Sequence, residues 1–202
     1  RRREMDISSP STEDRRLSVS VAKSLIHSAC LLDAQFLVMD PGWGDPNSEA
    51  RGYRFAAESL AELASTALDC GVTLCIENPP PGTSFCDSAP RVVHLVRSLG
   101  LDGLKVCLNV GHSNLYTSPA EDIQICGPDL GLVHLSDNDG SSDQHLPPGQ
   151  GSLDLPGVLQ SLDRSPGEVP VVLDIYGPSP PGAEDLLRRS LEMISSLSRG
   201  VG

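Results

Sequence analysis

The sequence has no Cys-x-x-Cys pair among its six cysteines. Cys75 and Cys107 instead lie inside short apolar runs. Disulfides form mainly in oxidising compartments, where cysteines of small domains are spaced as a covalent framework. The pattern here indicates buried, reduced thiols in a cytoplasmic protein.

A membrane-spanning helix needs about 20 consecutive apolar residues, and the sequence has no apolar stretch of that length. The opening residues, Arg1 to Met5, lack the apolar core of a signal peptide. We therefore expect a cytoplasmic protein without membrane partners. Because the sequence does not begin with methionine, we also expect the natural N-terminus to lie upstream.

Basic residues are fewer than acidic residues in this sequence. The sequence has 15 lysine and arginine residues against 27 aspartate and glutamate residues, a formal net charge of −12. An acidic surface repels phosphate backbones, so we expect poor non-specific affinity for nucleic acid.

No G-x-G-x-x-G motif follows any apolar run, so a dinucleotide site of that kind has no support. What the sequence does contain is an alternation of short apolar runs with helical patterns. Runs of four to six residues of this kind predict parallel strands buried on both faces. They lie at residues 36–39, 72–76, 104–108, 130–135 and 169–173.

Helical patterns fill the intervals between these runs. Ser11 begins the first as a capping hydroxyl followed by acidic residues, and Gly71 and Gly100 stand where helices should end. Alternating strands and helices predict a parallel α/β fold, although an open doubly wound sheet would show the same alternation. The helical patterns span residues 11–32, 53–68, 92–99, 119–126, 155–162 and 183–197.

Each apolar run ends at a side chain that can bind a metal ion or a substrate. In a barrel of parallel strands the carboxyl ends form the active face, so these side chains would line one polar pocket. The alternative is that polar residues simply terminate strands. The terminal residues are Asp40, Glu77, Asn109, His134 with Asp137, and Asp174.

Strand alternation adds a second expectation. Residues two positions before each terminus point to the same side of the sheet. All are apolar or thiol side chains, which predicts a filled layer beneath the polar one. They are Val38, Cys75, Cys107, Leu132 and Val172.

Several of these strand ends carry motifs of a known family. The sequence contains Cys75-Ile76-Glu77-Asn78, Asn109-Val110-Gly111-His112, His134-Leu135-Ser136-Asp137, and a loop from Asp143-Gln144-His145 to Gly149-Gln150-Gly151. Together they resemble the xylose-isomerase-like TIM barrels, which include sugar phosphate isomerases and epimerases and AP endonuclease family 2.

This resemblance covers the chain from about Ile7 onward. It implies a (β/α) TIM barrel of which only strands four to eight are present, as a single partial domain over residues 1–202. A closed barrel needs eight strands, and five would leave sheet edges exposed. We therefore expect a fragment of a longer protein, or a chain completed by a partner such as a homo-oligomer.

The resemblance also implies a cofactor, a divalent metal ion such as Mn²⁺, Mg²⁺, Co²⁺ or Zn²⁺. Its ligands by position are Glu77, Asn109, His134 and Asp174, with Glu77 and Asp174 as the acid/base pair on opposite sides of the pocket. Asn109 stands where the family has aspartate, and Asp174 where it has glutamate. One carboxylate fewer predicts weaker metal binding.

Further residues are implied to bind substrate: His112, His145, Asp143, Trp43 and Asp40. The endonuclease branch uses the positions of His112, Asp143 and His145 for additional metal ions, and it has histidine where this sequence has Asp40. Trp43 follows the first strand, where it could stack on a sugar ring or cover the barrel mouth.

The function implied is metal-dependent isomerisation or epimerisation of a sugar or sugar phosphate, a small-molecule substrate, through paired carboxylates. One alternative is a phosphodiesterase of the class II AP endonuclease type. The other is a non-catalytic relative with a degraded metal site, because of Asn109 and Asp174.

Overall fold

The computed structural model describes residues 5–45, 47–176 and 182–198, so residues 1–4 of the opening segment lie outside the described part. The chain divides into two compact units, Arg1–Cys107 and Leu108–Gly202, each of which is described by itself. The expectation of a single domain over the whole chain stays a prediction.

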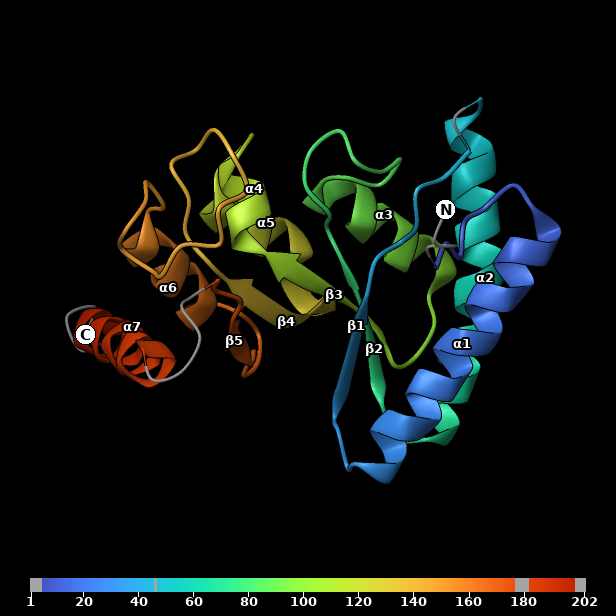
Figure 1. Ribbon diagram of the computed structural model, residues 1–202, viewed down its shortest axis with the longest axis horizontal. Helices are drawn as coiled ribbons and strands as arrows, with labels where there is room; N and C mark the ends of the chain where they lie inside the picture. The colour runs from blue at the N-terminus through green and yellow to red at the C-terminus, as the bar shows by residue number, and fades with distance from the viewer. Residues whose placement is uncertain (1–4, 46, 177–181, 199–202) are drawn as a thin grey trace. The chain divides into compact units, whose positions relative to one another are not determined.

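Unit 1 alternates helices with parallel strands (Figure 1). β1 pairs in parallel with β2, and β2 with β3. Helices α1 and α2 lie side by side, where Ile26 and Leu60 are fully buried. The elements are α1 (Thr12–Leu31), β1 (Phe36–Met39), α2 (Glu49–Asp69), β2 (Thr73–Glu77), α3 (Ala89–Leu99) and the first part of β3 (Leu104–Asn109).

Local capping sets the ends of these helices. The Ser11 hydroxyl accepts a hydrogen bond from the backbone of Asp14, as predicted for the first helix. α2 begins four residues earlier than expected, because Ser48 caps it by accepting from the backbone N–H of Arg51. Gly100 ends α3 in the left-handed conformation that the sequence predicted there.

Unit 2 continues the alternation, and β4 pairs in parallel with β5. The expected strand at 169–173 begins only at Val171. Pro170 precedes it and has no N–H to donate, although its carbonyl accepts from Val133. The elements are the end of β3, α4 (Val110–Asn114), α5 (Pro119–Cys126), a 3₁₀ turn (Gly127–Asp129), β4 (Leu130–Leu135), α6 (Leu155–Asp163), β5 (Val171–Leu173) and α7 (Gly182–Ser198).

The apolar layer below the strand ends is filled only in part. Cys75, Cys107 and Leu132 are buried as expected, whereas Val38 is half-buried and Val172 is 44% exposed. The expectation was therefore wrong for Val172. Within the described residues, β5 has a partner strand on one side only, so fewer neighbouring side chains cover it.

Burial also determines the reactivity of the cysteine thiols. All six are free, and Cys75, Cys86, Cys107 and Cys126 are buried, while the other two are partly exposed. Burial raises the pKa of the Cys75 thiol to about 12, which keeps it protonated and unreactive at neutral pH. Of the helices in the described ranges, none has both the length and the apolar character of a membrane span.

Candidate functional site

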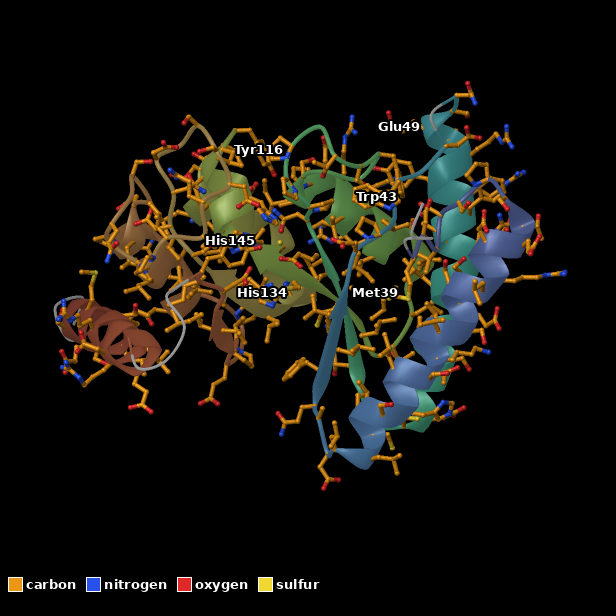
Figure 2. The ribbon with its side chains drawn as sticks, in the orientation of Figure 1. Met39, Trp43, Glu49, Tyr116, His134 and His145 are labelled. Atoms are coloured by element: carbon orange, nitrogen blue, oxygen red, sulfur yellow. The ribbon has the colours of Figure 1, made fainter. Side chains whose placement is uncertain are left out.

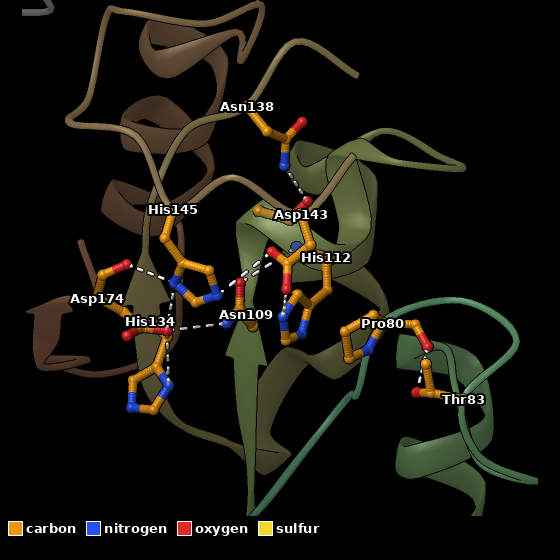
Figure 3. Close-up of polar contacts among 10 residues, drawn as sticks. Pro80, Thr83, Asn109, His112, His134, Asn138, Asp143, His145 and Asp174 are labelled. Carbon is orange, nitrogen blue, oxygen red and sulfur yellow. Dashed lines mark hydrogen bonds and ion pairs between the residues drawn. The ribbon is translucent and has the colours of Figure 1, made fainter. Parts of the chain in front are cut away.

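The carboxylate of Asp174 is the centre of a polar cluster in unit 2 (Figure 3). Asn109 ends β3, His134 lies in β4, and Asp174 follows β5. Oδ2 of Asp174 lies 3.2 Å from Nδ2 of Asn109 and 3.9 Å from Nδ1 of His134. Unit 2 thus brings together three of the four side chains that the resemblance implies as metal ligands.

Both ends of the Asn109 side-chain amide are engaged. Its oxygen accepts a hydrogen bond from the backbone N–H of His112 at 3.1 Å, which caps α4. Only the oxygen can accept, so this bond fixes the orientation and turns the nitrogen toward Asp174. Asn109 therefore aligns the Asp174 carboxylate and starts the short helix that carries His112.

Gly111 is required in α4 by close approach of the chain. A β-carbon at this position would lie 2.5 Å from Oγ of Ser136 and 3.2 Å from Oδ1 of Asn109. The Asn138 side chain donates a hydrogen bond to the Gly111 carbonyl at 2.7 Å. The Gly-His pair of the motif thus lets α4 pack against the segment that follows β4.

A second cluster joins His112, Asp143 and His145. Nε2 of His112 lies 3.4 Å from Oδ2 of Asp143, and Nε2 of His145 lies 3.3 Å from its Oδ1. Both imidazole rings are buried, whereas Asp143 is exposed. The three ligand atoms all lie within 4.8 Å of one another.

His145 is held in an unusual conformation by the segment after β5. Its φ of +50° is left-handed, which costs about 1–2 kcal/mol for a residue other than glycine. Nδ1 lies 2.8 Å from the Asp174 carbonyl and 3.2 Å from Oδ2 of the same residue. A carbonyl can only accept, so Nδ1 carries a hydrogen, and in the neutral ring Nε2 keeps its lone pair.

Tyr176 completes this support, and sequence reasoning missed it. Its backbone N–H donates to the His145 carbonyl at 2.9 Å, and its ring stacks on the imidazole at 4.2 Å between centroids. Its place in the sequence was the available signal. Tyr176 lies two residues after Asp174, and in an extended chain side chains two residues apart point to the same side. The stacked tyrosine fixes the plane of the His145 ring.

Asp137, in the predicted His-x-x-Asp motif, organises a loop. Its carboxylate accepts four backbone hydrogen bonds at 2.8–3.0 Å, and the side chain is fully buried. The donors belong to Asn138, Gly149, Gly151 and Leu153. Asp137 thus closes the loop that presents Asp143 and His145.

Asp122 is a buried carboxyl group that sequence reasoning also missed. It lies in the first turn of α5 with 1% of its surface exposed. Burial raises its pKa above the ordinary value, although hydrogen bonds with Ser113 and Tyr116 oppose that shift. It anchors α5 next to the helix that carries His112.

In unit 1 the predicted residues follow β1 and β2. Glu77 ends β2 and is half-buried, with a carboxylate oxygen within 4.8 Å of the Cys107 sulfur. Asp40 and Trp43 follow β1 and help to line a cavity of about 210 Å³. The other lining residues are Met5, Gly42, Pro79, Pro80, Thr83 and Ser84.

The donor atoms in unit 2 suit a divalent cation. Metal–nitrogen and metal–oxygen bonds of about 2.0–2.2 Å allow one ion to be reached by the ligand atoms of His112, Asp143 and His145. Two imidazoles and a carboxylate are a donor set suited to zinc and other first-row metals. The Asp174 cluster supplies one further imidazole, His134, and one further carboxylate.

Comparison with known sequences gives one family. A family model described as "Xylose isomerase-like TIM barrel" matches residues 2–197. The uncharacterized protein MJ1311 of Methanocaldococcus jannaschii is 29% identical over 157 residues, which cover 73% of this chain and 53% of the relative. The chain therefore spans about half the length of that relative.

Solved structures give the same fold. A D-tagatose 3-epimerase-like protein has a TM-score of 0.83 at 22% identity, covering 96% of this chain and 75% of its own. The TTHB071 protein of Thermus thermophilus, soaked with ZnCl₂, has a TM-score of 0.75 at 22% identity, covering 98% and 75%. The predicted fold class, a partial TIM barrel with five parallel strands, is confirmed. The chain belongs to the xylose isomerase-like TIM barrel family, as its strand-end motifs predicted.

Proposed function

We propose that the protein is a metal-dependent isomerase or epimerase of a sugar or sugar phosphate. The observation that carries the proposal is that Nδ2 of Asn109 and Nδ1 of His134 lie 3.2 and 3.9 Å from the Asp174 carboxylate at the strand ends of unit 2. The likeness to a D-tagatose 3-epimerase-like protein supports it. The proposed metal ligands are Glu77, Asn109, His134 and Asp174.

The chemistry of such a reaction is proton transfer next to a carbonyl group. One carboxylate removes the proton to give an enediolate, and a second acid returns it. We assign these roles to Glu77 and Asp174. The hydrogen bond from Asn109 holds the Asp174 carboxylate, and the one between Nδ1 of His145 and the Asp174 carbonyl holds its backbone, so little reorganisation is needed when the carboxylate accepts a proton. A bound divalent cation supplies polarisation of the substrate oxygens.

A second candidate is a phosphodiesterase of the class II AP endonuclease type. The observation that favours it is the assembled cluster of His112, Asp143 and His145. These are the positions that the resemblance assigns to additional metal ions in that branch. Several cations in one site suit displacement at phosphorus, because they stabilise both the attacking and the leaving oxygen.

Deuterium exchange tests the isomerase proposal most directly. The chain, loaded with Mn²⁺, Co²⁺ or Zn²⁺, is incubated in D₂O with a panel of ketoses, aldoses and their phosphate esters. Proton abstraction should place deuterium on the carbon next to the carbonyl, visible by NMR. Asp174→Asn keeps the shape of the side chain but removes the base, so exchange should cease.

Asp163→Asn is the matched control, because it makes the same chemical change at an exposed position at the end of α6. It should exchange deuterium as the unsubstituted protein does. Bound metal without exchange on any sugar of the panel would contradict the isomerase proposal. Metal stoichiometry separates the two candidates, with one ion per chain expected for the isomerase and two or more for the phosphodiesterase.

A further inference from the structure

Helices α1 and α2 of unit 1 run parallel with a fixed register. They lie side by side, and α2 begins at Glu49 (Figure 2). The Arg15 guanidinium lies 4.2 Å from the centroid of the Phe55 ring. About two turns further along, Nζ of Lys23 lies 2.7 Å from Oε1 of Glu62. These pairs join residues 40 and 39 positions apart, so residues nearer the ends of the two helices should meet at the same interval.

Two cysteines meet at this interval, where the helices end. Cys30 is the last residue but one of α1, and Cys70 caps the C-terminus of α2. Their thiols are hydrogen-bonded to each other. Both residues are partly exposed, whereas the other four cysteines are buried. Cys30 and Cys70 are therefore the two thiols that a small reagent can reach together.

The backbone that carries each thiol is held by the same type of helix ending. At the end of α1 the N–H of Ala34 donates to the Ala29 carbonyl at 2.9 Å, and at the end of α2 the N–H of Val72 donates to the Ala67 carbonyl at 2.9 Å. In each case the residue before the donor is left-handed, with φ of +53° in the first and +68° in the second. This is the Schellman arrangement, which fixes the last turn of a helix. The two thiols are thus presented to each other by fixed backbones.

The surroundings of the pair do not complete a metal site. Zinc held by thiolates takes four ligands at about 2.0–2.3 Å. Among the described residues, the groups of three or more side chains that could hold one ion include neither Cys30 nor Cys70. Two thiols in contact, without further ligands, are instead suited to a bond between their own sulfur atoms.

We propose that Cys30 and Cys70 form a redox modification site, which small disulfides convert into an intramolecular disulfide between α1 and α2. The Cys30 thiolate attacks one sulfur of the small disulfide and releases the first small thiol, which leaves a mixed disulfide on the protein. Deprotonated Cys70 then attacks the Cys30 sulfur and releases the second small thiol. The protein loses two electrons and two protons, which reduce the small disulfide to two thiols.

The order of attack follows from the environment of Cys70. Partial burial raises the pKa of its thiol, and the contact with Cys30 and the negative charge of Asp69 raise it further. Little of Cys70 is thiolate at neutral pH, so we assign the first attack to Cys30. A thiol with a raised pKa is also a slow leaving group, so a reductant should open the finished disulfide slowly at the Cys30 sulfur.

The disulfide would close a loop that contains β1 and α2. A cross-link of this kind reduces the conformational entropy of the unfolded chain, and the effect grows with the length of the loop. Oxidation should therefore stabilise the folded protein. By the same linkage, the folded chain should form the disulfide more readily than the unfolded chain does.

Thiol–disulfide equilibration tests the site in the full chain without metal. The chain is incubated at mildly alkaline pH with mixtures of 2-mercaptoethanol and its disulfide, in buffer and again in urea. Remaining thiols are alkylated and counted by mass spectrometry. In buffer we expect the thiols of Cys30 and Cys70 to be lost, with the chain still of monomer size on a denaturing, non-reducing gel. Half-oxidation should need about tenfold less of the small disulfide in buffer than in urea.

Single substitutions test the identity and the order of the two thiols. Cys70→Ala should stop at the mixed disulfide on Cys30, visible as the added mass of one half of the reagent. Cys30→Ala should react about tenfold more slowly and form no intramolecular disulfide. Cys126→Ala is the matched control, because it makes the same change at a buried cysteine of unit 2. It should form the disulfide as the unsubstituted chain does.

Retention of all six thiols in buffer, under conditions that oxidise the chain in urea, would overturn the proposal. So would a disulfide-linked dimer in place of the intramolecular disulfide, or an intramolecular disulfide that persists in Cys70→Ala. The site needs neither a metal ion nor a sugar, so these outcomes are independent of the isomerase proposal.

Discussion

Asn109 stands where the family pattern has aspartate, and its amide is used in a way that a carboxylate could not reproduce. The nitrogen donates to Oδ2 of Asp174 at 3.2 Å while the oxygen caps α4. A carboxylate could cap the helix equally well but would place a second negative oxygen against Asp174. The amide therefore stabilises the metal-free protein at the expense of one metal-binding charge.

Asn109→Asp should consequently have opposite effects on the free and metal-bound protein. Without metal we expect a loss of about 1–2 kcal/mol in unfolding free energy, because two carboxylates meet without a donor between them. With Mn²⁺ we expect affinity to rise by about tenfold. Calorimetric titration and thermal melting with and without Mn²⁺ measure both effects.

His134→Ala should abolish Mn²⁺ binding in the same experiment. Asn114→Asp is the matched control, because it adds a charge in α4, where Asn114 contacts Asn138 and Ser152 instead of Asp174. Unchanged or weaker Mn²⁺ affinity in a folded Asn109→Asp protein would remove the four-ligand assignment.

Tyr176 should matter for the metal affinity of the cluster formed by His112, Asp143 and His145. Tyr176→Ala removes the ring that stacks on His145 at 4.2 Å and leaves the backbone bond in place. We expect about tenfold weaker binding of Co²⁺ or Zn²⁺, with a changed Co²⁺ absorption spectrum, because a supporting contact orients the ligand. Tyr176→Phe keeps the ring and should retain both the metal affinity and the Co²⁺ spectrum of the unsubstituted protein.

Tyr116→Ala controls for the loss of an exposed tyrosine in unit 2, since Tyr116 is 40% exposed and its side chain hydrogen-bonds to Asp122. Equal effects of the two alanine substitutions would show that Tyr176 acts through general stability. The Co²⁺ absorption spectrum separates an effect on ligand orientation from an effect on general stability. Loss of stability alone leaves the absorption of the bound ion unchanged.

At the scale of elements, the loop from Asn138 to Leu153 depends on one carboxylate. Asp137→Ala would leave four backbone N–H groups without their acceptor, in a site with no exposed surface on Asp137. We expect a loss of about 3 kcal/mol or more in the free energy of unfolding, measured by urea denaturation.

Asp139→Ala provides the comparison within the same loop. Asp139 also accepts hydrogen bonds, from Ser141 and Ser142, and those from Ser141 hold its pKa below the ordinary value. It is exposed, so water can replace its bonds, and the substitution should have a much smaller effect. Similar losses in the two variants would contradict the assigned role of Asp137.

The elements themselves were largely predictable. Apolar runs located all five strands, and Ser11 and Gly100 located helix ends, because these signals act within one turn of the chain. Helix α4 was not predicted. Its five residues show no apolar period, and its start depends on Asn109, whose orientation is fixed by its partner Asp174.

At the scale of the whole molecule, we expect the 202-residue chain to self-associate. β5 carries Val171 and Val172 with 40% and 44% of their surfaces exposed, and within the described residues it pairs with β4 alone. Open strand edges with apolar side chains pair with other chains. Sedimentation velocity should show species larger than a monomer, or aggregation.

Val172→Lys should reduce this association, because charge at a strand edge opposes pairing. Val21→Lys makes the same change in α1, where the valine is 38% exposed, and should leave association unchanged. A soluble monomer with one cooperative melting transition would contradict the expectation.

We also expect the chain to leave abasic-site DNA uncleaved with Mn²⁺ or Zn²⁺. The net charge of −12 opposes approach to a phosphate backbone. A gel assay on a duplex with one abasic site measures this. Metal-dependent cleavage that vanishes in His112→Ala would reverse the ranking of the two proposed functions, because a contaminating nuclease would be unaffected by that substitution.

The sequence by itself determined the alternation of strands and helices, the polar residue at each strand end, and the family. These follow from local periodicity, from caps, and from motif spacing along the chain. It also named Asn109, His112, His134, Asp143, His145 and Asp174, which unit 2 brings together.

Only the tertiary structure decided how these side chains are used. It turned the Asn109 nitrogen toward Asp174, made Asp137 the acceptor for a loop, and stacked Tyr176 on His145. The physical reason is that a hydrogen bond or ring contact depends on the direction of both partners. Packing between segments far apart in the sequence sets those directions.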